Sequence, residues 1–161
     1  MIRDVRIEDA ARIAEIYNYY IEETIVTFEY DTVSAKEIEN RINKIQSKRY
    51  PYFVYEEDGL VLGYAYLNNW RERAAYDITL ETSIYLDHNF IARGLGSIMY
   101  EELITRARKK DIHSLIGSIS LPNDASRKLH KKFNFELIGN FKESGVKFNK
   151  LIDVEFWQLI L

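Results

Sequence analysis

The chain of 161 residues contains no cysteine and only two prolines. The absence of cysteine excludes disulfides, zinc sites built on thiolates and a cysteine nucleophile. No apolar run reaches the length of a membrane span, and the charged start MIRDVRIEDA lacks the pattern of a signal peptide. We therefore expect a cytoplasmic protein with no membrane partner.

The chain also has no excess of positive charge. The net charge is −3, which argues against a nucleic-acid partner. The chain does have a hydrophobic share of 47% and a charged share of 29%, which are typical of a globular protein, and twelve tyrosines. Its length and the absence of low-complexity segments predict one domain over residues 1–161.

Hydrophobic periodicity predicts helices that alternate with strands, and hence a mixed α/β fold. Ser34 and Glu37 form the capping box of one helix, and Asp58-Gly59 is the turn of a hairpin. Helices are expected at 8–20, 34–48, from the glycines near 94 to 110, and 123–133. Strands are expected at 2–7, 51–57, 60–67, 76–86, 114–121, 135–141 and 153–161.

The stretch RGLGS, residues 93–97, places two glycines at the start of a helix. Glycine costs conformational entropy there, so we expect the bare backbone to serve a purpose. The spacing does not match a dinucleotide fingerprint, because Met99 stands where a third glycine is needed, and the Gly-Lys-Ser/Thr ending of a P-loop is absent. Two interpretations remain: amides at a helix N-terminus that bind a pyrophosphate, or a tight strand-to-helix turn.

The segment LETSIYL, residues 80–86, precedes this turn and alternates in the manner of a strand. One face is expected to carry Leu80, Thr82, Ile84 and Leu86, and the other Glu81, Ser83 and Tyr85. Downstream, PNDASRKLHKKFNF (122–135) is typical of a helix that begins at an asparagine after a strand.

A strand, an x-x-G-x-G/A turn and then N-x-A-S-x-x-L-H-x-x-x-x-F resemble the GCN5-related N-acetyltransferase (GNAT) superfamily. The likeness spans nearly the whole chain and is closer to the phosphinothricin (glufosinate)-type acetyltransferases. The segments that carry it, in the same order, are IAEIYNYYI with TFEY, YPYFVYEEDGLVLGYAY, WRERAAY, TLETSIYL and GVKFNKLID.

The resemblance implies a strongly bent mixed sheet with helices on both sides. It also implies acetyl-CoA, and no metal, at the point where two parallel central strands splay apart. By similarity, main chain of one strand pairs with the pantetheine arm, the turn amides bind the pyrophosphate, and two side chains of the next helix bind pantetheine. The strand residues are Ile84, Tyr85 and Leu86. The turn residues are Arg93, Gly94, Leu95, Gly96 and Ser97, and the helix residues are Asn123 and Ser126.

Two positions depart from the superfamily pattern. Ile91 stands where Arg or Gln is usual, which we expect to weaken cofactor binding without abolishing it, with Arg93 as a replacement charge. Asn134 stands where glycine is usual, and asparagine is the non-glycine residue that best tolerates positive φ.

The implied reaction is direct transfer of an acetyl group from a thioester to a primary amine. An ammonium has no lone pair, so a base must remove a proton, and Glu81 matches the glutamate that the family is proposed to use. His130 matches the tyrosine that many superfamily members place near the departing thiolate. The simpler alternatives are a solvated carboxylate for Glu81 and a helix-packing role for His130.

The acceptor site is expected at WRERAAY, where Arg71 and Arg73 share a face and suit an anionic group. Tyr76 and Phe28 resemble the family's pocket aromatics. The favoured function is N-acetylation of a small amino acid or analogue, such as phosphinothricin or methionine sulfoximine, by a homodimer. Alternatives are acetylation of a protein N-terminus or polyamine, a non-catalytic CoA sensor, and a nucleotide-binding oxidoreductase.

Overall fold

A seven-stranded sheet runs through the protein in a computed structural model, which describes residues 1–91 and 93–161. The strands are β1 (Ile2–Asp4), β2 (Tyr52–Glu57), β3 (Leu60–Asn69), β4 (Thr79–Leu86), β5 (Ser114–Ser120), β6 (Glu136–Lys147) and β7 (Lys150–Ile160). The helices are α1 (Ala10–Glu23), α2 (Ala35–Ser47), α3 (Leu95–Arg108) and α4 (Asp124–Lys132), with single 3-10 turns at η1 (Ile7–Asp9), η2 (Ala74–Tyr76) and η3 (His88–Phe90).

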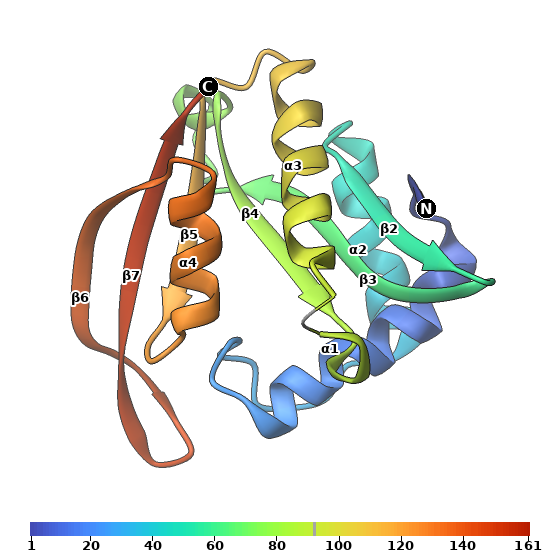
Figure 1. Cartoon of the computed structure of the whole chain (residues 1–161), viewed down its shortest axis with the longest axis horizontal. Helices are drawn as coiled ribbons and strands as arrows, with labels where there is room; N and C mark the ends of the chain where they lie inside the picture. Colours follow the sequence, from blue (N-terminus) through green and yellow to red (C-terminus); the bar gives the residue numbers. More distant parts are fainter. Residues whose placement is uncertain (92) are drawn as a thin grey trace.

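The strand order is β1-β2-β3-β4-β5-β7-β6, and β4 and β5 are the parallel pair. These two strands pair over only three positions, from Thr79 opposite Ser114 to Glu81 opposite Ile116. Beyond Glu81 they diverge, while β4 stays paired with β3 as far as Leu86. The sheet therefore opens at its centre (Figure 1), and one edge of β4 has no neighbouring strand there.

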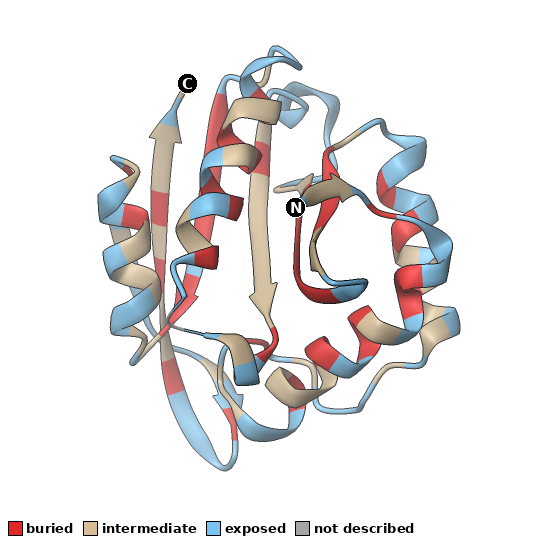
Figure 2. Cartoon of the chain, turned by 45° about the vertical axis from the view of Figure 1, so that its right-hand side comes forward, coloured by how far each residue is buried: buried red, intermediate tan, exposed pale blue. Residues whose placement is uncertain are grey.

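Two apolar cores lie on opposite faces of the sheet, and Figure 2 marks buried residues on both the helices and the strands. The first core joins α1 and α2 to the tyrosine-rich face of β2 and β3, and Tyr85 of β4 packs against it. The second joins α3 to Leu80 and the rest of the central strands, and Ile84 and Leu86 pack against it. The predicted alternation of β4 and the helices on both sides are thus confirmed.

Local signals set several of the element ends. The Ser34 hydroxyl accepts a hydrogen bond from the Glu37 amide at 3.1 Å, as predicted for the start of α2. Asn123 likewise caps α4 by accepting from the Ser126 amide at 3.1 Å. Asn134, which follows α4, has a φ of 62°, so asparagine does fill a left-handed position there.

Several predicted boundaries differ from the structure, and the following strands differ most. The first strand ends at Asp4 and not at 7, because Asp9 accepts hydrogen bonds from the Arg3 guanidinium and the Arg6 amide and holds the chain in a 3-10 turn. β4 begins at Thr79, after a 3-10 turn at Ala74–Tyr76. β6 and β7 form one long hairpin, while separate strands at 135–141 and 153–161 were expected.

The hairpin turn was missed because its two residues, Phe148 and Asn149, adopt positive φ of 52° and 57° without glycine. Among the residues that the structure describes, no helix is both long enough and apolar enough to cross a membrane.

Candidate active site

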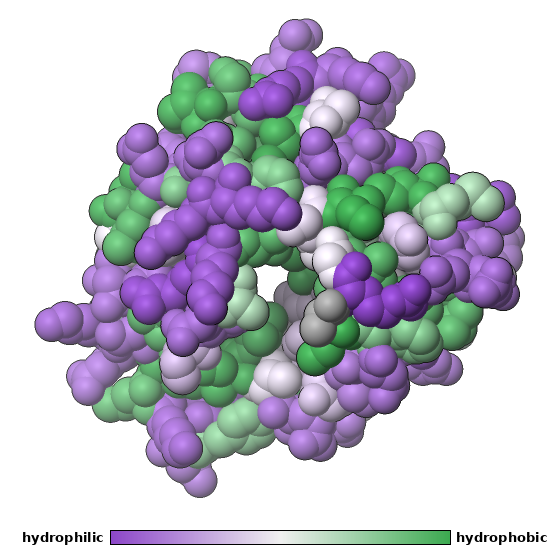
Figure 3. Space-filling model, in the orientation of Figure 1, coloured by the Kyte–Doolittle hydropathy of each residue, from purple (hydrophilic) through white to green (hydrophobic). Residues whose placement is uncertain are grey.

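A cavity of about 280 Å³ lies where β4 and β5 diverge. Figure 3 shows the surface hollowed at the centre of this face. Strand β4 supplies one wall, β5 and α4 supply the other, and a segment of the α1–α2 connection covers one end. The lining includes seven of the residues that the sequence nominated: Phe28, Glu81, Ile84, Tyr85, Asn123, Ser126 and His130.

Glu81 is half-buried on β4 at the last position that pairs with β5. Burial raises the pKa of its carboxyl above the usual range, and a hydrogen bond with the Ser118 hydroxyl partly opposes that shift. No cation contributes to the shift among the described residues. A carboxylate with a raised pKa that faces a cavity is suited to accept a proton near neutral pH.

His130 is 5% exposed, and its ring lies against the β5 backbone at Gly117. A side-chain Cβ at Gly117 would lie 2.1 Å from the His130 Nε2 atom, so glycine is required at that position. The His130 Nδ1 atom lies 2.8 Å from the Ser126 carbonyl, which fixes the proton on Nδ1. Nε2 is then the acceptor for the Tyr100 hydroxyl at 2.9 Å.

Tyr100 also reaches β4, because its hydroxyl lies 3.0 Å from the Thr82 Oγ1 atom. Because the Tyr100 proton goes to His130, the Thr82 hydroxyl shares its own proton between the Tyr100 oxygen and the Ile116 carbonyl, which lies 3.3 Å away across the point where the strands separate. Burial lowers the pKa of the His130 imidazole, and its bond to the Ser126 carbonyl partly opposes this. A neutral histidine and a protonated tyrosine therefore line the cavity together.

The glycine turn has the form that an anion site requires. Gly94 precedes α3 with a φ of 76°, and its carbonyl accepts from the Ser97 and Ile98 amides. The Leu95 and Gly96 amides begin the helix, where amides have no partner within the helix. Lys132 of α4 donates to the Ser97 hydroxyl at 2.8 Å and brings a cation to the turn.

The arginine at position 93 is already engaged. Its guanidinium donates to the Glu57 carboxylate at 2.8 and 3.1 Å on the surface of the protein. Ile91 is 56% exposed beside it. Lys132, a residue that the sequence did not nominate, is a cation that the structure places at the turn.

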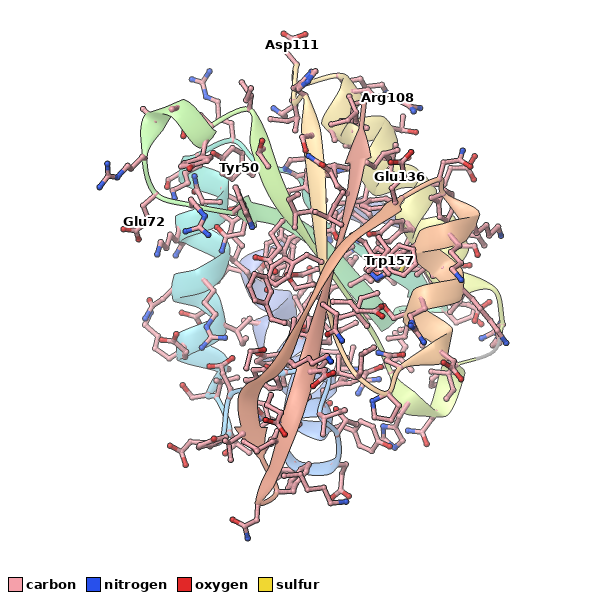
Figure 4. The ribbon with its side chains drawn as sticks, turned by 90° about the vertical axis from the view of Figure 1, so that its left-hand side faces the viewer. Tyr50, Glu72, Arg108, Asp111, Glu136 and Trp157 are labelled. Carbon is pink, nitrogen blue, oxygen red and sulfur yellow. The ribbon has the colours of Figure 1, made fainter. Side chains whose placement is uncertain are left out.

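Arg71 and Arg73 lie in the exposed connection between β3 and β4, near the end of β4 that carries Glu81. Arg71 stacks on Trp70, with its Cζ atom 4.7 Å from the ring, and Tyr76 packs edge-on against the same ring at 5.4 Å. Glu72 stands between these two arginines in the sequence, and Figure 4 shows Glu72 at the outer edge of the protein. Neither arginine nor Tyr76 is among the described residues that line the cavity, and their role in acceptor binding stays a prediction.

Comparison with known proteins shows the family of this chain. The model of the acetyltransferase (GNAT) domain family matches residues 2–156. The chain belongs to the GNAT acetyltransferase family. It is 35% identical over 157 residues to a phosphinothricin N-acetyltransferase of Streptomyces viridochromogenes, covering 98% of this chain and 85% of that protein.

Two further relatives are also acetyltransferases. One is an L-methionine sulfoximine/L-methionine sulfone acetyltransferase of Salmonella typhimurium, 33% identical over 95% of this chain and 90% of that protein. The other is the structure of a GNAT phosphinothricin acetyltransferase from Sinorhizobium meliloti in complex with acetyl-CoA. It has 33% identity and a TM-score of 0.97 over 100% of this chain and 88% of that chain. The resemblance, the fold and the acetyltransferase class are confirmed.

Several residues of this GNAT site were not nominated from the sequence. Gly117 carried a signal, because glycine inside a buried strand often marks the close approach of another group. Tyr100 and Ser118 had none, since each reads as an ordinary member of a helix or strand. Among residues 1–91 and 93–161, no cluster of three or more histidine or acidic side chains could hold a metal ion.

Proposed function

We propose that this enzyme transfers the acetyl group of acetyl-CoA to the primary amine of a small amino acid or amino-acid analogue. The observation that carries the proposal is the cavity at the β4/β5 divergence, which joins Glu81 to the unpaired edge of β4. The names of the relatives support an acceptor of the phosphinothricin or methionine sulfoximine kind.

We propose the same cofactor-binding residues that the family resemblance implies, and the geometry supports them. The main chain of Ile84, Tyr85 and Leu86 would pair with the pantetheine arm, and Asn123 and Ser126 would bind it from the other wall. The pyrophosphate would lie on the amides of the turn that runs from Arg93 through Gly94, Leu95 and Gly96 to Ser97. Support comes from the left-handed Gly94 and from the positive end of α3.

In this mechanism Glu81 removes a proton from the acceptor ammonium, and the free amine attacks the acetyl carbonyl carbon. The new C–N bond forms as the C–S bond breaks, and the proton that the new amide nitrogen releases balances the one that the departing thiolate takes up. His130 is our candidate on that side, acting through Tyr100: its Nε2 atom holds the Tyr100 hydroxyl, which would donate to the thiolate and be reprotonated by the proton from the nitrogen.

A thiol-release assay tests the function directly. Acetyl-CoA is offered with a panel of amines that includes phosphinothricin, methionine sulfoximine, neutral amino acids, a polyamine and a peptide with a free N-terminus. We expect release with the amino-acid analogues and little with the polyamine. Release with only the peptide would move the function to protein N-terminal acetylation, and no release with any amine would favour a CoA sensor.

Arg73→Ala is expected to raise the KM for an anionic amino-acid acceptor about tenfold and to leave the KM for acetyl-CoA unchanged. A guanidinium that binds a carboxylate or phosphinate contributes on the order of 1.5–3 kcal/mol, whereas the cofactor has no contact with this loop in our proposal. Arg49→Ala, on a different exposed turn, is the matched control. Equal damage to both KM values would mean that Arg73 has a structural role instead.

We further propose a homodimer, formed through the β6–β7 hairpin. Six large apolar side chains are exposed on this hairpin, and clusters of exposed apolar residues often mark protein–protein contacts. They are Leu137, Ile138, Phe141, Val146, Phe148 and Leu151. Light scattering would give the mass in solution, and a monomer at micromolar concentration would refute the dimer. A cytoplasmic location stays a prediction.

A further inference from the structure

Lys147, the last residue of β6, is an ammonium that the chemistry above does not use. Its side chain is only 3% exposed, and no carboxylate lies within ion-pair distance of it among the described residues. Charged lysines are almost never fully buried without a partner, because removing the charge from water is costly. Burial accordingly lowers the pKa of Lys147.

The partners of Lys147 are main-chain carbonyl groups. Its Nζ atom donates to the Thr27 carbonyl at 2.7 Å and lies 3.4 Å from the Tyr20 carbonyl. Tyr20 belongs to the last turn of α1, whose carbonyls form the negative end of the helix dipole and favour a cation. Thr27 lies 120 residues away in the chain, in the connection between α1 and α2.

That connection forms one end of the active-site cavity, through Val26, Thr27 and Phe28. Its position depends on the end of β6. The Phe28 ring lies over Gly145, where a Cβ atom would be 2.2 Å from the ring, and the Tyr30 hydroxyl donates to the Val146 carbonyl. Residues 145–147 therefore contact residues 26–30, which we call the covering segment, and hold this segment in position.

The other contacts of the covering segment come from the helices. The Tyr17 hydroxyl bonds to Thr27 Oγ1 at 2.7 Å and to the Glu29 carboxylate, which Arg41 of α2 also holds at 2.7 and 2.8 Å. These bonds use side chains of the segment. Lys147 holds the Thr27 backbone carbonyl, so it fixes the main chain immediately before Phe28.

We infer that Lys147 is a positioning residue for acceptor binding: its buried ammonium fixes the Thr27 carbonyl and so places Phe28 over the cavity. The inference rests on the proposed function, because Phe28 can matter to an acceptor only if one binds there. It assigns Lys147 no contact with acceptor or acetyl-CoA.

Lys147→Met tests this, since methionine keeps most of the length of the side chain and removes the ammonium. We expect the KM for the amino-acid acceptor to rise about tenfold, the scale of one charged hydrogen bond. The KM for acetyl-CoA should stay within twofold, because the turn at Gly94 and α3 lies on other elements. Lys150→Met removes an exposed lysine opposite Lys147 in the same hairpin and should change neither constant.

Chemical rescue separates charge from packing, and the absence of cysteine from the chain makes it specific. Lys147→Cys is unfolded, treated with 2-bromoethylamine to rebuild an ammonium of lysine length, and refolded; a parallel sample receives 1-bromopropane. The aminoethyl product should recover the wild-type acceptor KM, and the propyl product should not. Recovery in both samples, or in neither, would overturn the inference, as would equal changes in both KM values for Lys147→Met.

Hydrogen exchange supplies a readout that does not depend on turnover. Amides of residues 26–30 should exchange faster in Lys147→Met than in Lys150→Met, while those of α3 stay unchanged. If the wild-type enzyme acetylates no amino-acid amine, the proposed function fails even though exchange responds. If the wild type is active and neither exchange nor acceptor KM responds, the positioning role of Lys147 fails alone.

Discussion

Glu81→Gln is expected to lower kcat at pH 7 by roughly 10²- to 10⁴-fold, the range that general-base catalysis contributes. Glutamine keeps the shape of the side chain and its ability to hydrogen-bond with Ser118, but it cannot take a proton from the acceptor. Acetyl-CoA should bind the variant with wild-type affinity, because the predicted cofactor contacts lie further along β4 and on α3. Steady-state kinetics and a binding titration on the same preparation measure both quantities.

The dependence on pH gives this prediction a second, independent test. The wild-type rate should rise with pH as the Glu81 carboxyl ionises. Because burial raises the pKa of Glu81, this rise should occur at a higher pH than the ordinary glutamate pKa of about 4.3. The glutamine variant should lack that limb. Its rate should instead rise at alkaline pH, where more of the acceptor amine arrives deprotonated.

Stability provides the control for folding. A carboxyl group whose pKa is raised in the native state binds its proton more tightly in the folded protein than in the unfolded chain. Its ionisation at higher pH therefore lowers the free energy of unfolding. Glu81→Gln removes this cost and should not lower the melting temperature at pH 7. Glu101→Gln, at an exposed carboxylate of α3, should leave the rate unchanged.

A folded glutamine variant that binds acetyl-CoA and turns over at a near-normal rate would contradict the role of Glu81. The proton would then leave through a water chain or through the pair of His130 and Tyr100. His130→Phe would distinguish these routes, because it removes the acceptor of the Tyr100 hydroxyl while filling the space beside Gly117.

The sequence predicted those parts of the fold that depend on local chemistry. The alternation of Leu80 and Glu81 placed one in the core with α3 and the other in the cavity, because strand geometry alone decides that separation. Asn123 was recognised as a helix cap for a similarly local reason. The resemblance to a known family then added what local patterns lack, namely that two of the strands diverge.

The contacts that complete the site join residues far apart in the chain, and no local pattern encodes them. Lys147 reads as an alternating strand residue, and only the folded hairpin brings it to Thr27. Lys132 reads as the basic end of a helix, and only the packing of α4 beside α3 brings it to Ser97. His130 was nominated by its place in a motif, but its tautomer depends on Ser126 and Tyr100.

The glycine turn leads to the second large effect: Gly96→Val is expected to weaken acetyl-CoA binding tenfold or more, which is about 1.4 kcal/mol or more of binding free energy. A Cβ atom at Gly96 would lie 3.8 Å from Leu86 and 3.9 Å from Leu129, both ordinary contacts. The protein's own packing therefore does not require glycine there. Gly94 differs, since its φ of 76° strains any side chain and would confound folding with binding.

In our proposal, Gly96 leaves the backbone bare for a ligand that approaches the first turn of α3. Valine is no worse than glycine in a helix, so the unliganded melting temperature of Gly96→Val should equal or exceed that of the wild type. Acetyl-CoA should raise the melting temperature of the wild type, because any ligand that binds only the native state does so. This rise in melting temperature should be mostly absent from the variant. Gly96→Ala, which adds one methyl group, should lie between them. If the valine variant binds acetyl-CoA as tightly as the wild type, the pyrophosphate does not lie on this turn, and Gly96 serves only the passage from β4 into α3.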